Sequence, residues 1–275
     1  MSKDLEASQK LCLDPSGGMP RLLEIMARLR DPETGCPWDI EQTYATIAPY
    51  TIEEAYEVED AIARRDMAEL EAELGDLLLQ VVYFSQMGSE DGQFTFESVV
   101  KGVADKMVAR HPHIFGDESR DKSAEQQTAD WEKIKAAERA AKGPTRTLDG
   151  VALGLPGMTR AVKLQKRAAR VGFDWPQVGE VVDKIAEEAR ELSEAQDQPH
   201  YRQVEEFGDL LFVMANLARW LKIDPEEALR AANAKFTRRF EHIEDSLAAD
   251  GKTPADSNLT EMDALWEAAK AKERN

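Results

Sequence analysis

Residues 71–80 read EAELGDLLLQ, and residues 204–213 read VEEFGDLLFV. Each stretch places Glu-x-Gly-Asp directly before an apolar run, inside a longer segment with helical periodicity. A glycine inside a helix costs about 1 kcal/mol relative to alanine, and two carboxylates on one helix face repel each other. Because this unfavourable pattern occurs twice, it indicates a duplicated helix whose acidic edge serves something other than stability.

The two halves of the chain share five landmarks in the same order. The landmarks are 35–38 with 172–175, 53–57 with 187–191, 73–76 with 206–209, Lys106 and Arg110 with Lys235 and Arg239, and Trp131 and Lys135 with Trp266 and Lys270. The step from the second landmark to the third is also conserved, with 16 positions from Glu57 to Glu73 and 15 from Glu191 to Glu206. Such an ordered recurrence indicates an internal duplication.

Helical periodicity dominates the chain, and strand-like alternation between turn signals is hard to find. We therefore expect an all-α fold of two tandem helical-bundle domains, at 20–142 and 158–275. The intervening residues 143–157, GPTRTLDGVALGLPG, hold two prolines and four glycines and read as a linker. Residues 1–19 are expected to be a poorly ordered leader. A capping box at 51–54 is expected to open a helix that ends near Arg65.

Composition excludes several classes of function. The formal charge of −18 argues against binding a nucleic-acid polymer, which requires clustered Lys and Arg. No run of 18 apolar residues is present, so no membrane span is expected, and the N-terminus lacks the apolar core of a secretory signal. Cys12 and Cys36 form no CxxC pair. The sequence therefore predicts a soluble, cytoplasmic protein, and it lacks the GxxxxGK[ST] and GxSxG motifs.

Four carboxylates in each half are spaced to face one another. Residues three apart share a helix face, and a short loop makes consecutive helices antiparallel neighbours. Unpaired carboxylates that converge repel one another unless a cation is bound, and an all-oxygen set favours Mg²⁺, with Mn²⁺ as a substitute, over zinc. The predicted metal ligands are Glu54, Glu57, Glu73 and Asp76 in the first half, and Glu188, Glu191, Glu206 and Asp209 in the second. A single such motif would more often be a solvated helix face, but the repetition favours metal.

The glycine of the repeated pattern has a possible role beside this site. Without a side chain, Gly75 or Gly208 lets a neighbouring helix or a ligand approach the backbone.

A second group of residues is suited to a nucleotide. Lys235, Arg238 and Arg239 lie on one expected helix and match phosphate oxygens, although surface salt bridges explain them equally well if they are taken alone. Trp266, with Lys270 one turn later, is suited either to stacking on a base or to closing the helical core. The sequence leaves these two interpretations of Trp266 open.

The motifs LRDPETGCPWDIEQT, APYTIEEAYEV, ELGDLLLQVVYFSQM, RHPHIFG and KLQKRAARVGFDW, together with the paired EExxE and ExxD patterns, resemble the duplicated all-α nucleoside triphosphate pyrophosphohydrolases over residues 20–275. The resemblance implies compact helical halves, a homodimer, and Mg²⁺-dependent hydrolysis of NTPs and dNTPs between the α- and β-phosphates to NMP and pyrophosphate. It assigns the metal to Glu188, Glu191, Glu206 and Asp209, and nucleotide contacts to 235–239 and Trp266. It also implies that the second domain is the active one.

The sequence supports that asymmetry independently. Lys184, four positions before Glu188, has Tyr50 as its first-half counterpart, and Arg238 has Ala109. The first half therefore lacks two positive groups that could hold a triphosphate. We therefore expect the second half to catalyse, with Glu187 as a possible proton acceptor, and the first half to bind metal. Stacking on Trp266 predicts broad base specificity, and the resemblance implies clearing of nucleotide pools. The alternatives are a narrower dUTP- or phosphoribosyl-ATP-type pyrophosphatase, and a metal- and nucleotide-binding regulatory module.

Overall fold

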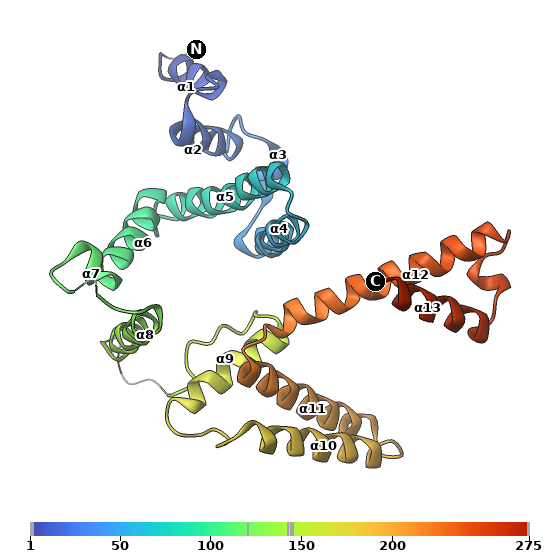
Figure 1. Ribbon diagram of the computed structural model, residues 1–275. Helices are drawn as coiled ribbons and strands as arrows, with labels where there is room; N and C mark the ends of the chain where they lie inside the picture. Colours follow the sequence, from blue (N-terminus) through green and yellow to red (C-terminus); the bar gives the residue numbers. More distant parts are fainter. Residues whose placement is uncertain (1–2, 120, 142, 144–145, 274–275) are drawn as a thin grey trace. The chain divides into compact units, whose positions relative to one another are not determined.

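The computed structural model describes residues 3–119, 121–141, 143 and 146–273, and within these ranges all regular structure is helical. This confirms the expected all-α class. The chain divides into two compact units, with the division after Ala137, inside the last helix before the predicted linker (Figure 1). Within the described ranges, none of the helices combines the length and the apolar character that crossing a bilayer requires.

The first unit is organised around the helix pair that carries the first acidic pattern. Its helices are α1 (Lys3–Leu13), α2 (Gly18–Leu29), α3 (Pro37–Glu41), α4 (Tyr44–Arg64), α5 (Met67–Glu90), α6 (Phe96–Arg110), α7 (Pro112–Phe115) and most of α8 (Ala124–Ala141). α5 packs against both α4 and α2. The buried core joins these three helices through Met26, Ile47, Val82, Tyr83 and Met87.

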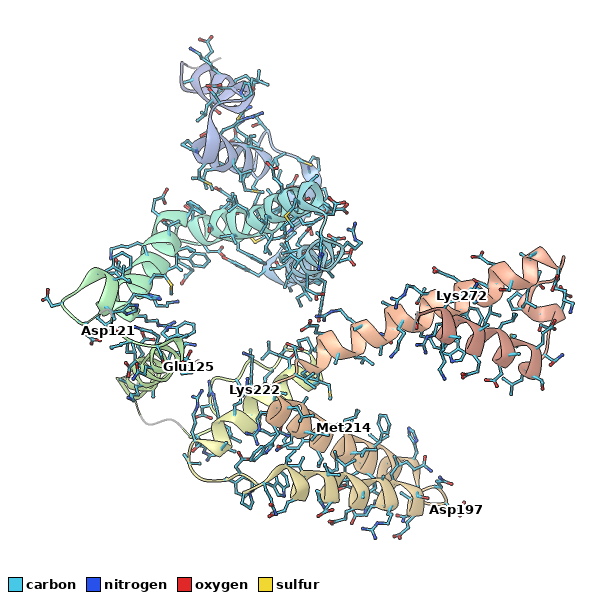
Figure 2. All side chains as sticks on the ribbon, viewed as in Figure 1. Asp121, Glu125, Asp197, Met214, Lys222 and Lys272 are labelled. Atoms are coloured by element: carbon cyan, nitrogen blue, oxygen red, sulfur yellow. The ribbon has the colours of Figure 1, made fainter. Side chains whose placement is uncertain are left out.

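The second unit repeats the helix pair. It contains α9 (Gly157–Ala169), α10 (Val178–Glu194), α11 (His200–Leu221), α12 (Pro225–Ala249), the short 3-10 helix η1 (Pro254–Asp256) and α13 (Leu259–Glu273). α11 packs against α10 and α9, and α12 packs against α13. Ala161, Val162 and Ala215 form the buried contact between α9 and α11. Figure 2 marks Asp197 in the short turn that makes α10 and α11 antiparallel neighbours.

Local signals explain where the site helices turn. Asp66 accepts a hydrogen bond from the backbone N–H of Glu69 and so caps the start of α5. Arg65 before it is left-handed, with φ of 58°, and ends α4. Only these two residues separate the helices, so α4 and α5 are held as an antiparallel pair. Asp224 caps α12 in the predicted manner, with Pro225 in the first turn.

Two expectations differ from the structure. The predicted leader contains α1, which packs against α2, where the Arg21 guanidinium donates a hydrogen bond to the Cys12 carbonyl. α4 begins at Tyr44 rather than near Thr51, because the operating capping box is Thr43 with Thr46. Pro49 lies inside α4 as its sixth residue, where it removes one helical N–H donor.

Candidate metal and nucleotide site

Three carboxylates of the second unit meet between α10 and α11. Glu188 on α10 and Glu206 on α11 are both buried, at 5% and 8% exposed, and Glu191 joins them from the next turn of α10. One oxygen from each lies within 4.8 Å of the other two. Asp209 lies one turn after Glu206 and is exposed, outside this group of three. The structure thus brings three of the four predicted ligands together.

Two cations of the same unit hold the buried carboxylates. The Lys184 ammonium donates to Glu187 and contacts Glu188, both at 2.7 Å, and these partners raise the pKa of Lys184. The Arg202 guanidinium donates to Glu206 at 2.6 Å and also pairs with Glu205. Arg202 was missed by the sequence analysis, although its position four residues before Glu206 is the helical spacing of an ion pair.

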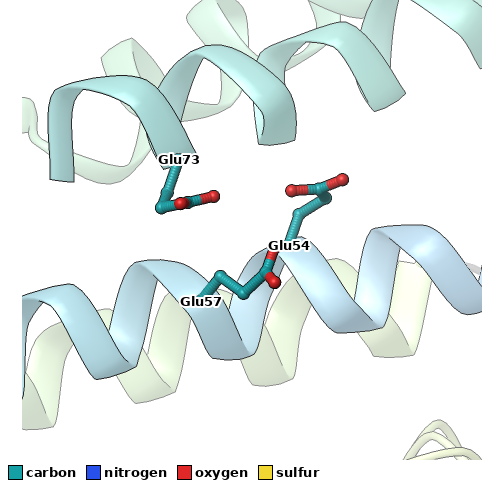
Figure 3. Close-up of side chains that lie close together, drawn as sticks. All are labelled: Glu54, Glu57 and Glu73. Atoms are coloured by element: carbon teal, nitrogen blue, oxygen red, sulfur yellow. The ribbon is translucent and has the colours of Figure 1, made fainter. Parts of the chain in front are cut away.

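The first unit gathers the equivalent carboxylates, with Tyr50 and Glu69 at the positions that Lys184 and Arg202 hold in the second unit. Figure 3 shows Glu54 and Glu57 on α4 and Glu73 on α5 directed into the space between the helices. One oxygen from each lies within 4.8 Å of the others. Burial raises the pKa of Glu54 and Glu73, and neighbouring carboxylates, Asp76 among them, raise both further. In the second unit, burial and then Glu188 raise the pKa of Glu191.

These groups fit a hard divalent cation. Carboxylate oxygens from two antiparallel helices converge in each unit, and no histidine or cysteine belongs to either described group. Burial first, and then repulsion between the carboxylates, raise the pKa of Glu54 and Glu191, and a bound cation would offset both effects. The residues present therefore match the magnesium site that the sequence predicted, while the identity of the ion is a proposal below.

Of the predicted nucleotide contacts, Lys184 lies on α10 beside the carboxylates, and the others form a separate group on α12 and α13. Arg239 donates to Glu273 through Nε at 2.9 Å and Nη2 at 2.6 Å, and Arg238 lies 3.6 Å from the same carboxylate. Trp266 packs its ring against Phe236, with the ring centroids 5.3 Å apart, and the Arg239 guanidinium lies 5.3 Å from the Trp266 centroid. The contacts found for this group among the described residues stay within α12 and α13.

The two remaining predicted contacts differ in their surroundings. Lys270 pairs with Glu267 at 2.7 Å on α13. Lys235 is exposed on α12. The described structure of the second unit therefore holds the carboxylates and the phosphate-type cations as two groups, and no hydrogen bond or ion pair found among the described residues joins them.

The comparison with protein families covers both helix pairs. Residues 42–115 and 177–244 each match the MazG nucleotide pyrophosphohydrolase domain. The chain belongs to the MazG family. The two matches include both carboxylate groups, Lys184, Arg202 and the 235–239 segment, and the second ends before Trp266. The resemblance read from the motifs and the duplication read from the spacing are both confirmed.

Several similar proteins align over nearly the whole chain. It is 51% identical over 256 residues to a nucleoside triphosphate pyrophosphohydrolase of Escherichia coli K12, covering 92% of this chain and 97% of the relative. It is 43% identical over 249 residues to the Thermotoga maritima nucleoside triphosphate pyrophosphohydrolase/pyrophosphatase MazG, covering 90% and 94%. It is 45% identical to the Bacillus subtilis uncharacterized protein YabN, covering 91% of this chain and 51% of YabN.

The proposed reason for the repeated glycine is partly wrong for this MazG chain. A Cβ atom built on Gly75 or Gly208 would meet nothing within 4 Å. Neither glycine is therefore needed for a close approach of the neighbouring helix inside its unit. Approach by a ligand or a second chain is the explanation that stays open to test.

Proposed function

We propose that this protein hydrolyses nucleoside and deoxynucleoside triphosphates between the α- and β-phosphates, giving NMP and pyrophosphate, in a Mg²⁺-dependent reaction at the second unit. The observation that carries the proposal is the convergence of Glu188, Glu191 and Glu206 from α10 and α11. MazG membership and the names of the relatives from E. coli and T. maritima support the reaction. The low cysteine content, with no CxxC pair, supports a cytoplasmic location.

The metal is assigned to the four second-unit carboxylates. Glu188, Glu191 and Glu206 supply the converging oxygens, and exposed Asp209 supplies the fourth from the next turn of α11. Mg²⁺ fits this all-oxygen set, and Mn²⁺ is the substitute with the closest ligand preference. When bound, the ion polarises phosphate oxygens and lowers the pKa of a bound water.

The protein's own charged groups orient the reaction. Glu187 is exposed beside the converging carboxylates and is held by Lys184, so it can accept the proton of the attacking water or orient that water. In-line attack at the α-phosphorus then expels pyrophosphate. Lys235, Arg238 and Arg239 offset the charge that grows on the β- and γ-oxygens.

Trp266 supports a sequence-tolerant contact with the base. Its ring already contacts Phe236 and the Arg239 guanidinium, and Lys270 follows one turn later on α13. Every nucleobase has a face that stacks on an indole. This predicts broad base specificity, which suits the clearing of nucleotide pools. A narrower dUTP-type or phosphoribosyl-ATP-type enzyme would instead favour one substrate strongly in a panel of NTPs and dNTPs.

A homodimer explains two features of the second unit together. The apolar side chains of Val204, Phe207 and Leu211 on α11 are 56%, 52% and 41% exposed, which is unusual for a stripe on one helix. The carboxylates and the phosphate-type cations also form separate groups within the chain. A second copy seated on the apolar stripe buries it, and can bring its own α12–α13 pair to the carboxylates.

Product analysis in H₂¹⁸O tests the reaction. Purified protein is incubated with each NTP or dNTP and Mg²⁺, and products are identified by phosphorus NMR and mass spectrometry. The expected products are ¹⁸O-labelled NMP and unlabelled pyrophosphate, because the water attacks the α-phosphorus, and both are lost in Glu206→Gln. Labelled pyrophosphate would locate the attack at the β-phosphorus, and NDP with phosphate would refute α–β cleavage.

The first unit has a second candidate function, a metal-binding regulatory module. Its three converging carboxylates support it, together with the absence of a lysine or arginine at the positions that Lys184 and Arg202 hold in the second unit. If this holds, Glu57→Gln changes metal binding or its effect on activity without removing turnover. Loss of all turnover in Glu57→Gln would instead assign catalysis to the first unit.

A further inference from the structure

The two acidic sites differ in the residues that stand one helical turn before them, although Arg64 pairs with Glu69 at 3.3 Å in the first unit. Four residues before Glu188 stands Lys184, and four residues before Glu206 stands Arg202. The equivalent first-unit positions, four before Glu54 and four before Glu73, are Tyr50 and Glu69. The four predicted metal ligands and these two preceding positions make six positions in each half. In the first half they hold five carboxylates and a tyrosine, and in the second they hold four carboxylates, a lysine and an arginine.

The second-unit cations occupy the atoms that a metal needs. Lys184 Nζ lies 2.7 Å from Glu188 Oε1, and Arg202 Nη2 lies 2.6 Å from Glu206 Oε1. Both carboxylate side chains are buried, at 6% and 10% exposed, whereas Lys184 and Arg202 are 32% and 38% exposed, so water weakens these contacts only in part. A divalent cation that binds Glu188 Oε1 and Glu206 Oε1 competes with both contacts, and a cation released from its carboxylate then requires another anion.

The first-unit site carries a different neighbour. Gln80 on α5 is 8% exposed, and its side-chain amide faces Glu54, with Nε2 3.5 Å from Glu54 Oε1. Its amide oxygen is buried with no hydrogen-bond partner among the described residues. A buried amide oxygen without a partner is costly, and it is also a hard ligand of the type that Mg²⁺ and Mn²⁺ accept. The second-unit counterpart of Gln80 is Val213.

We propose that the two sites load divalent cations under different conditions. The first-unit site binds metal without nucleotide, whereas Lys184 and Arg202 keep the second-unit oxygens covered until a triphosphate gives both cations a new anionic partner. Metal and nucleotide then enter the second unit together, which prevents a bare metal site from persisting there. The inference rests on the proposed function only in taking the triphosphate as that new partner.

Mn²⁺ binding to the full-length protein without nucleotide tests the proposal. The free ion is measured by electron paramagnetic resonance during a titration, with calorimetry in parallel. Wild-type protein is expected to show one tight class of sites, which disappears in Glu57→Gln and is unchanged in Glu206→Gln. The double variant Lys184→Met, Arg202→Met is expected to gain a second class at least about tenfold tighter than in wild type, the scale of a partly buried charge pair. That class must disappear when Glu206→Gln is added.

Controls separate charge from damage to the fold. Methionine keeps most of the apolar stem of each side chain. The single variant Lys184→Arg keeps the charge and must show the wild-type binding pattern. Lys252→Met removes another lysine of the second unit, paired at 2.7 Å with Glu261, and must change nothing. In the wild type, an α,β-methylene nucleoside triphosphate is expected to produce the second class.

Two results would overturn the proposal. One is a Glu206-dependent tight Mn²⁺ site in the wild type without nucleotide. The other is no gain of sites in the double variant whose circular dichroism matches the wild type. The titration requires no turnover, so either result is distinct from a failure to release pyrophosphate, which would count against the proposed function alone.

Discussion

The ion pair between Arg30 and Glu90 is expected to stabilise the first unit through its charge. It joins the end of α2 to the end of α5, the helix that carries Glu73. Arg30 donates to Glu90 from Nε at 3.0 Å and from Nη2 at 2.7 Å, and the two side chains are 9% and 32% exposed. The contact is therefore bidentate and largely buried on the arginine side.

The free energy that this ion pair contributes lies between two known limits. Exposed ion pairs contribute about 0–1 kcal/mol, and breaking a buried pair costs about 3–5 kcal/mol. Arg30 also donates to the carbonyls of Asp39 and Gln42, so its charge keeps polar partners after Glu90→Gln. Glu90 is one-third exposed as well. We therefore expect a loss of about 2 kcal/mol, or about a 30-fold change in an opening equilibrium.

The assay is hydrogen exchange read by mass spectrometry on α2 and α5 peptides at pH 7. Glu90→Gln should speed exchange about 30-fold there under conditions where exchange reports the opening equilibrium. Arg30→Met completes a double-mutant cycle, and Asp60→Asn at the exposed Arg64–Asp60 pair is the control. A change below about threefold, or equal changes in Glu90→Gln and Asp60→Asn, would refute the reasoning.

The stability that the Arg30–Glu90 pair contributes depends on pH. Burial alone would raise the pKa of Glu90, but hydrogen bonds from Arg30 and Gln86 outweigh it and hold the pKa below its usual value. A lowered pKa in the folded state means that the stabilisation is present at neutral pH and is lost as the pH falls through that value. The difference between wild type and Glu90→Gln should therefore shrink in acid, and a difference that grows in acid would contradict this sign.

Three further predictions concern the nucleotide and the dimer. Trp266→Ala should raise KM for all NTPs about 5- to 100-fold, on the scale of base stacking, with Trp266→Tyr recovering most of it; unchanged KM would return Trp266 to a packing role. Glu273→Gln should lower KM, because it frees Arg239 for phosphate; a raised KM would mean that Glu273 only orients Arg239. Phe207→Glu should shift light-scattering mass from dimer to monomer, and a dimer that persists would exclude this face.

Periodicity and spacing predicted most of the fold, because long amphipathic helices with marked ends leave a strong local signal. One failure, the start of α4, occurred where two local signals competed. Thr51 with Glu54 matched a capping box, while Thr43 with Thr46 supplied the one that operates. Residues 3–13 were expected to be poorly ordered, and their pairing with α2 is a tertiary effect.

The site was predictable in part for the same reason. Helical spacing brought Glu188 and Glu191 to one face, and the short turn placed Glu206 opposite them. Spacing alone did not reveal that Lys184 and Arg202 would fold back onto these carboxylates rather than extend toward a ligand. That choice depends on burial of the carboxylates, which a single sequence does not encode locally.

The most direct test of the central claim compares equivalent ligands in the two halves. Glu206→Gln and Glu73→Gln each remove one carboxylate charge with little change in size, and pyrophosphate release from one NTP is measured for both with saturating Mg²⁺. The account predicts that Glu206→Gln lowers kcat/KM more than about 100-fold, the scale of a lost preorganised charge. Glu73→Gln should keep most of the activity. Loss of activity in Glu73→Gln with full activity in Glu206→Gln would contradict catalysis at the second unit.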